Sequence, residues 1–502
     1  MGCVLAIDAG TSGVRTLAFD EAGMLTDQAT RPLTPHFPRP GWVEHDPVEI
    51  WDLVRASLAE VAGRLSERGT PIAAVGLANQ RETVVAWDRR TGRPLHDAIV
   101  WQDRRTAARC EELAAEGQLE PVRERTGLVL DPYFSATKFE WLLTHGGVAA
   151  GADLALGTVD AWLLWQLTGG KAFATDVTNA SRTMLCDIRT RCWTEELCAR
   201  FGVPLAALPD VHPSCGRIGV VAPDVAAGVP TLAGVPVSGV AGDQQAALFG
   251  QACTEPGLAK VTYGTGSFVL VHAGARCPPP ADGLVSTIAW DLGGHANGRA
   301  SDVAYALEGS TFVSGAAIQW LRDGLGLIER SEDIGPLAES VPDAGGLVVV
   351  PAFTGLGSPW WDPRARGVVT GITTGAGRAQ LARAVVEAIA FGVRDMVDAM
   401  TRALGRPIPQ LRADGGASAM RLLLQLQADQ LQVPVVRPRC IESTALGAAM
   451  LAGLAEGVWG GLDELRALWR PDLECAPHTD RRTADLAYGA WQRSVDRCRA
   501  WT

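Results

Sequence analysis

Short apolar runs alternate with Gly-rich turns along much of the chain. Residues 4–19 (VLAIDAGTSGVRTLAF) place apolar and β-branched residues on both sides of a Gly/Thr turn, a pattern that predicts a strand, a turn and a second strand. Residues 259–271 (AKVTYGTGSFVLV) have the same pattern about half a chain later. We therefore expect two halves, each built on a similar sheet.

The segments beside these hairpins alternate between strand and helix patterns. Residues 72–78 predict a strand that runs into the polar sequence NQRE, and residues 83–87 predict its return strand. Residues 159–167 and 381–400 predict helices, and the second of these has apolar residues at helical spacing. Strands that alternate with helices predict an α/β fold.

The division into domains is predicted from the middle of the chain. Residues 204–236 are rich in Pro and Gly and predict irregular structure ahead of a strand at 237–240. We place the domain boundary near residues 249–255. The expected domains are therefore 1–250 and 251–502.

The composition is that of an ordinary globular protein and narrows the range of functions. The 502 residues are 47% hydrophobic and 20% charged, with a formal net charge of −11, and that acidic balance argues against a nucleic-acid partner. No apolar run approaches the roughly 18–20 residues of a membrane span, and no signal-peptide pattern opens the sequence. The 11 cysteines lack the short spacings of zinc sites. We expect reduced thiols in a cytoplasmic protein.

The two Gly/Thr turns are candidate phosphate sites. Backbone N–H groups in such turns form anion-binding nests, and the hydroxyls of Thr11, Ser12 and Thr265 add donors. Each turn alone is better explained as a structural hairpin, but a pair of turns could hold a polyphosphate from both sides of a cleft. Asp8 ends the first strand, where a carboxylate could hold the waters of a phosphate-bound Mg²⁺ or simply start the turn through an Asx hydrogen bond.

A third turn of this kind lies within residues 411–432, which predict a strand, an Asp-Gly-Gly turn and a helix. Glycines there would let a ligand approach the backbone closely, or would let the helix pack closely on the strand. No Walker or protein-kinase motif accompanies any of the three turns.

Polar residues that interrupt apolar segments suggest a pocket for a small polyol. Arg81 can donate to hydroxyl oxygens, Glu82 can accept hydroxyl protons, and the indole of Trp101 can pack on a carbon skeleton. The alternatives are a surface ion pair and a core tryptophan.

Asp243 and Gln244 stand in the otherwise small and apolar segment GVAGDQQAALFGQ. A carboxylate taken out of water is costly unless a partner compensates it. Asp243 is thus either the N-cap of a helix with residues 244–249 in its first turns, or a carboxylate kept for chemistry.

Long runs over essentially the whole chain closely resemble the glycerol kinases of the FGGY carbohydrate kinase family. They include GWVEHDPVEIWD, NQRETVVAW, AIVWQDRRTA, GLVLDPYFSATK, TNASRTMLCDI, SGVAGDQQAALFGQ, YGTGSF and PAFTGLGSPWWDPRARG. The resemblance implies an α/β fold of two actin-like (ribonuclease H-like) ATPase domains around a central cleft, which binds ATP, Mg²⁺ and a polyol.

The resemblance also implies the site residues, with Asp243 as general base and Gln244 orienting the polyol. The implied glycerol contacts are Arg81, Glu82, Trp101, Tyr133, Asp243, Gln244 and Phe268. The implied nucleotide contacts are Thr11, Ser12, Gly13, Arg15, Thr265, Gly315, Gln319, Gly416 and Met420. Asp8 and Asp243 are the expected Mg²⁺ ligands. Met420 stands where the family commonly has Asn.

We therefore expect ATP-dependent phosphorylation of glycerol to sn-glycerol 3-phosphate by a cytoplasmic homo-oligomer, with no nucleic-acid partner and no membrane span. One alternative is an FGGY kinase for another polyol or a ketose sugar, because a few pocket contacts decide substrate choice. The other is a weakly catalytic regulatory homologue, which Ala9, Gly13 and Met420 would support because they remove polar atoms near the nucleotide.

Overall fold

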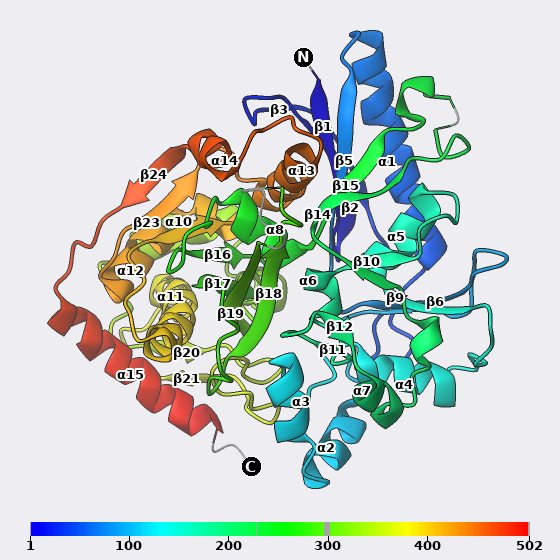
Figure 1. Cartoon of the computed structure of the whole chain (residues 1–502). Coiled ribbons are helices and arrows are strands. Elements are labelled where there is room, and N and C mark those ends of the chain that lie inside the picture. Colours follow the sequence, from blue (N-terminus) through cyan, green and yellow to red (C-terminus); the bar gives the residue numbers. More distant parts are fainter. Residues whose placement is uncertain (1, 227, 296–301, 500–502) are drawn as a thin grey trace.

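The computed structural model describes residues 2–226, 228–295 and 302–499 and contains two large β-sheets (Figure 1). The first sheet has the strand order β14-β15-β5-β1-β2-β3. Its strands are β1 (Cys3–Ala9), β2 (Gly13–Phe19), β3 (Leu25–Pro32), β5 (Ile72–Asn79), β14 (Cys215–Val220) and β15 (Pro236–Gly242).

The second sheet has the strand order β18-β19-β17-β16-β22-β23-β24. Its strands are β16 (Ala259–Tyr263), β17 (Ser267–Gly274), β18 (Val285–Asp291), β19 (Val303–Thr311), β22 (Leu411–Asp414), β23 (Val435–Pro438) and β24 (Pro471–Cys475).

Both sheets share one five-strand arrangement. Each begins with an antiparallel hairpin, β1–β2 or β16–β17, and a third antiparallel strand, β3 or β19, extends it on one side. Two parallel strands extend it on the other side, β5 and β15 in the first sheet and β22 and β23 in the second. The repeated hairpin pattern in the sequence thus marks the start of each sheet, which confirms the prediction of two halves on similar sheets.

A third, smaller sheet shows that one predicted strand pairing is wrong. It contains β4 (Glu44–His45), β6 (Val84–Asp88), β7 (Arg93–Pro94), β8 (Ala98–Ile99) and β9 (Leu154–Thr158). The predicted return strand at 83–87 is β6, but it pairs with β7, β8 and β9, not with β5. The intervening NQRE segment forms no tight turn, because its buried side chains bond to other segments; Asn79, for example, donates to Asn179.

The remaining strands form two-stranded pairs. They are β10 (Ala174–Asp176) with β13 (Asp210–His212), β11 (Cys186–Asp187) with β12 (Cys192–Trp193), and β20 (Val348–Val350) with β21 (Val368–Thr370). The prediction of irregular structure at 204–236 is therefore wrong where β13 and β14 form. The segment of β14, CGRIGV, carries a weak pattern because two glycines interrupt it, and its antiparallel pairing with β15 makes it a strand.

Helices surround the sheets. They are α1 (Pro47–Glu67), α2 (Ala107–Ala115), α3 (Leu119–Thr126), α4 (Ala136–Thr144), α5 (Val159–Leu167), α6 (Val177–Ala180), α7 (Glu195–Arg200), α8 (Asp243–Gly250), α9 (Gly315–Gln319), α10 (Ile334–Glu339), α11 (Arg378–Leu404), α12 (Arg421–Leu431), α13 (Ser443–Ala455), α14 (Leu462–Leu468) and α15 (Arg481–Arg499). The predicted helices at 159–167 and 381–400 are confirmed as α5 and part of α11. No helix of the described residues is long and apolar enough to cross a membrane.

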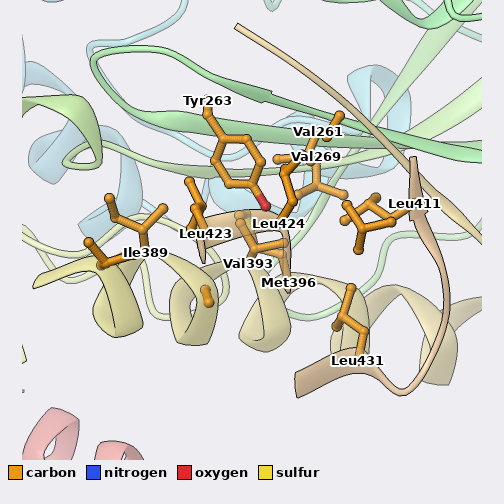
Figure 2. Packing of buried hydrophobic residues seen from close by; sticks show 14 of the residues in the cluster. Val261, Tyr263, Val269, Ile389, Val393, Met396, Leu411, Leu423, Leu424 and Leu431 are labelled. Atoms are coloured by element: carbon orange, nitrogen blue, oxygen red, sulfur yellow. The ribbon is translucent and has the colours of Figure 1, made fainter. Parts of the chain in front are cut away.

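The core of the second half shows why α11 is helical. Its apolar residues recur at helical spacing and form one face. Figure 2 shows Val393 of this face beside Leu424 of α12 and below Val261 and Val269 of the sheet, with Ile389 one helical turn away beside Leu423. All of these residues are buried in one cluster. Burying such a face in well-packed contact is the main source of stability for a helix of this kind.

Helix α13 comes late in the sequence but packs on β1, β5 and β15 of the first sheet and on α8. Backbones approach very closely there. A Cβ atom at Gly447 would lie 1.8 Å from the carbonyl oxygen of Ala246, and one at Gly76 would lie 2.2 Å from that of Ala448. Glycine is therefore required at both positions. The surrounding cluster joins buried residues of both large sheets.

We expect Gly447→Ala to lower the thermal unfolding midpoint, because α13 and α8 would have to move apart. Overpacking a core typically costs about 1–3 kcal/mol. The matched control is Gly63→Ala in α1, where an added Cβ meets no atom within 4 Å and where alanine favours the helix by up to about 1 kcal/mol. Equal midpoints for the two purified variants in thermal denaturation would contradict the packing argument.

Candidate active site

Two cavities meet at the turn between β16 and β17. The smaller has a volume of about 330 Å³, the larger about 600 Å³, and Thr265 lines both. The smaller cavity has walls from both halves of the chain, and all of the expected glycerol contacts line it: Arg81, Glu82, Trp101, Tyr133, Asp243, Gln244 and Phe268.

Strand register brings the polar residues of the first half together. Strands β1, β5 and β15 are parallel neighbours, with Ala9 opposite Asn79 and Asn79 opposite Gly242. All three strands therefore end at the same edge of the sheet, where the carboxyl ends of parallel strands commonly carry ligand sites. The first Gly/Thr turn, the Arg81–Glu82 pair and Asp243 each follow one of these strands directly.

Asp243 is the first residue of α8, and Gly242 occupies the N-cap position. The interpretation of Asp243 as N-cap is therefore wrong; its Oδ1 accepts from the adjacent Gln244 N–H at 2.7 Å. The side chain keeps 29% of its surface accessible, as part of the cavity wall. Burial raises the pKa of Asp243 to about 6, with the Arg81 charge opposing and the Glu82 and Asp8 charges adding to the shift.

Arg81 and Glu82 form no surface ion pair, since both side chains are only 2% exposed. The guanidinium of Arg81 donates to both carboxylate oxygens of Glu308, at 2.5 and 2.8 Å, and to the Tyr133 hydroxyl at 2.9 Å. Arg182 donates to Glu308 at 3.0 Å and to Glu82 at 2.8 Å. The polyol contacts thus belong to a buried network of two cations and two anions.

Sequence reasoning missed Glu308 and Arg182. Glu308 comes from β19 in the second half and is 1% exposed. Burial alone would raise its pKa, but the charges of Arg182 and Arg81 outweigh burial and lower the pKa to about 2. A lone carboxylate in the apolar strand VAYALEGST is a signal that could have identified Glu308. Arg182 follows a short polar segment and carries no comparable signal.

Three aromatic rings form the apolar wall of the smaller cavity. Trp101 meets Tyr133 edge-on with ring centroids 5.5 Å apart, and Phe268 with centroids 6.3 Å apart. The indole Nε1 of Trp101 donates to the Thr11 hydroxyl at 2.8 Å. That bond ties the apolar wall to the first Gly/Thr turn, so the polyol and phosphate sides of the cavity are held together.

Seven of the nine expected nucleotide contacts line one or both of these cavities. Thr11 and Ser12 line the smaller cavity. Thr265, Gly315, Gln319, Gly416 and Met420 are among the residues that line the larger cavity.

Gly13 and Arg15 line neither cavity. A Cβ at Gly13 would lie 2.7 Å from the carbonyl oxygen of Arg31, so this glycine serves the close pairing of β2 with β3. Arg15 donates to Asp8 at 2.6 Å and also to Glu442. Its charge is therefore held by two carboxylates.

Asp8 and Asp243 were the expected metal ligands. The described residues contain no group of three or more His, Cys, Asp or Glu side chains that could hold a metal by themselves. Asp8 lines neither cavity and accepts a hydrogen bond from Arg15 at 2.6 Å, while its charge adds to the raised pKa of Asp243. Mg²⁺ commonly takes one or two carboxylates and fills its remaining positions with phosphate oxygens and water. Asp8 and Asp243 supply carboxylates of this type, and a Mg²⁺ bound there would share Asp8 with Arg15.

Family models match both halves of the chain. The N-terminal domain of the FGGY family of carbohydrate kinases matches residues 3–250, and its C-terminal domain matches residues 259–456. The chain belongs to the FGGY family of carbohydrate kinases. The resemblance found in the sequence motifs is thereby confirmed.

Within this family, the chain is similar over its full length to glycerol kinases and, at lower identity, to a xylulose kinase. The glycerol kinase of Carboxydothermus hydrogenoformans is 49% identical over 502 residues, which cover 99% of this chain and 98% of that protein. The structure of Plasmodium falciparum glycerol kinase with ADP superposes with a TM-score of 0.91 at 33% identity, covering 99% and 98%. The structure of the xylulose kinase of Rhodospirillum rubrum superposes with a TM-score of 0.84 at 27% identity, covering 98% of each chain. These likenesses confirm the expected two-domain α/β fold.

We expect Glu308→Gln to lower the free energy of unfolding by about 3–5 kcal/mol, because two buried guanidinium groups lose the carboxylate between them. The control is Asp52→Asn, which removes the pair with Arg55 (3.2 Å, side chains 54% and 57% exposed) and should cost below about 1 kcal/mol. Urea denaturation measures the free energy of unfolding of each variant. Similar losses for the two variants would show that Glu308 does not compensate the arginines.

Proposed function

We propose that this protein transfers the γ-phosphoryl group of ATP to a terminal hydroxyl of glycerol, giving sn-glycerol 3-phosphate and ADP. The observation that carries the proposal is the meeting of two cavities at Thr265, one lined by polyol-type contacts and one by Gly-rich turns. The 49% identity to a glycerol kinase over the whole chain supports glycerol as the polyol.

The smaller cavity offers complementary donors and acceptors to a polyol. Four of the five N–H groups of Arg81 face Glu308, Tyr133 and Gln245. The Nε atom lies 3.4 Å from Asp243 Oδ1 and 3.5 Å from Glu82 Oε1. Both distances are longer than a usual N–H···O bond, so the Nε–H can donate to a hydroxyl oxygen placed beside these carboxylates. Arg182 donates to Glu82 Oε1, and among the described residues no donor bonds to Glu82 Oε2. Glu82 can therefore accept from a polyol hydroxyl while the aromatic wall covers the carbon chain.

Asp243 acts as the general base in this proposal. Its carboxylate accepts the proton of the terminal hydroxyl as that oxygen bonds to the γ-phosphorus, and the bond to the β,γ-bridging oxygen breaks to release ADP. A pKa of about 6 keeps the carboxylate ionised at neutral pH while leaving it basic enough to accept a proton. Asp8 and Asp243 would hold Mg²⁺, which when bound neutralises charge on the phosphates.

The two Gly/Thr turns would position the transferred group from both halves. Thr11 and Ser12 lie on one side of the smaller cavity and Thr265 on the other, and fixed donors of this kind stabilise charge on phosphoryl oxygens in the transition state. We also propose a cytoplasmic location, with which the free state of all the cysteines agrees. The homo-oligomeric state stays a prediction.

The test is a coupled ADP-release assay with glycerol, erythritol, xylulose and gluconate. We expect glycerol to give the highest kcat/KM, because the chain is 49% identical to a glycerol kinase over its whole length. The likeness to a xylulose kinase makes a ketose the second candidate. A higher kcat/KM with another substrate would assign the chain to a sibling kinase, and no turnover with any of them would support the regulatory homologue.

We expect Asp243→Asn to reduce kcat by at least about 10², because Asn keeps the shape of the side chain but cannot accept the proton. Glycerol binding should stay detectable by calorimetry. The matched control is Asp463→Asn in α14, whose side chain is 97% exposed and lines neither cavity. A near-normal kcat for Asp243→Asn would remove Asp243 from the chemistry.

A further inference from the structure

Lys260 is a buried cation that the proposed chemistry does not use. It lies on β16 in the second half and is 0% exposed. Its Nζ donates to the Oε1 atom of Gln244 and to the Thr262 hydroxyl at 2.8 Å. Among the described residues, no carboxylate lies within ion-pair distance of this ammonium. A buried ammonium without an ion pair is costly, so its position calls for a reason.

The ammonium lies in a directed chain of hydrogen bonds. The Thr262 hydroxyl gives its proton to Asp414 Oδ1 at 2.6 Å, so its oxygen is free to accept from Lys260. Asp414 Oδ2 in turn accepts from Gln251 at 2.8 Å. Burial lowers the pKa of Lys260 to about 8, with the charges of Asp414 and Asp243 opposing that shift. The side chain is therefore protonated at neutral pH and can only donate.

This donor fixes the orientation of the Gln244 amide. Because an ammonium has no acceptor, the amide oxygen of Gln244 must face Lys260, and its Nε2 group points away from it. Gln244 lines the same cavity as Asp243. A donor at this place leaves the proton of a polyol hydroxyl available to Asp243, whereas an acceptor would compete for that proton.

We propose that Lys260 is a positioning residue that holds the Gln244 amide with its Nε2 group toward the polyol, so that Gln244 donates to a hydroxyl oxygen. The inference rests on the proposed function of the cavity, in which Gln244 contacts the polyol. It also makes the second half of the chain responsible for the orientation of a side chain on α8 of the first half.

A double-mutant cycle tests the proposal with Lys260→Met, Gln244→Ala and the double variant. We expect Lys260→Met to raise the KM for the polyol about 10-fold, the size of one lost hydrogen bond to a substrate, with the KM for ATP nearly unchanged. The double variant should be no worse than Gln244→Ala, because Lys260 acts through Gln244. Lys171→Met, on an exposed lysine, is the matched control. Additive losses would overturn the proposal.

Gln244→Glu provides a second test that does not depend on removing the buried lysine. Its carboxylate can still pair with Lys260 but has no N–H to offer a polyol, so we expect a KM as high as that of Gln244→Ala. A KM like that of the unsubstituted enzyme would show that position 244 accepts, which contradicts the proposal. All variants are measured with whichever substrate gives the unsubstituted enzyme its highest kcat/KM. Failure of glycerol as substrate is thereby separated from failure of the positioning role.

Discussion

The close approach of α13 to α8 and to the first sheet is the constraint on which the site depends. Only glycine fits at positions 447 and 76, because a Cβ at either would overlap a backbone carbonyl oxygen. Helix α8 continues directly from β15, so the packing that holds this helix also fixes Asp243 and Gln244 at the sheet edge. The candidate base is thus placed by main-chain contacts that tolerate almost no displacement.

Buried charge is the second organising feature, and it joins the two halves. Glu308 from β19 contacts Arg81, and Lys260 from β16 contacts Gln244. Each of these contacts places a charged residue of the second half against a cavity residue of the first. Since an unpaired buried charge is costly, the relative position of the halves and the charge balance of the cavity constrain each other. The cavity is therefore a property of the whole chain and not of either half.

Much of the fold and cavity could be predicted, and the exceptions have physical causes. Local patterns predicted the two hairpins, α5 and α11, because the period of apolar residues depends only on neighbours in sequence. The partner of β6 could not be found in this way, since strand pairing depends on distant segments. Arg15 and Gly13 fit a phosphate turn by position, yet one pairs with Asp8 and the other permits strand packing. Lys260, a single cation in the strand AKVTY, carries the same kind of signal as Glu308, but its contact with Gln244 depends on a separate segment and could not be predicted locally.

The place of α13 also bears on how the chain folds during its synthesis. The first sheet contains residues from 3 to 242, but the face of β1, β5 and β15 that α13 covers stays open until residues 443–455 have been made. Through most of translation that apolar face has no covering helix, and it is the kind of surface that chaperones and other nascent chains bind. The half that leaves the ribosome first is consequently one of the last parts of the molecule to be completed.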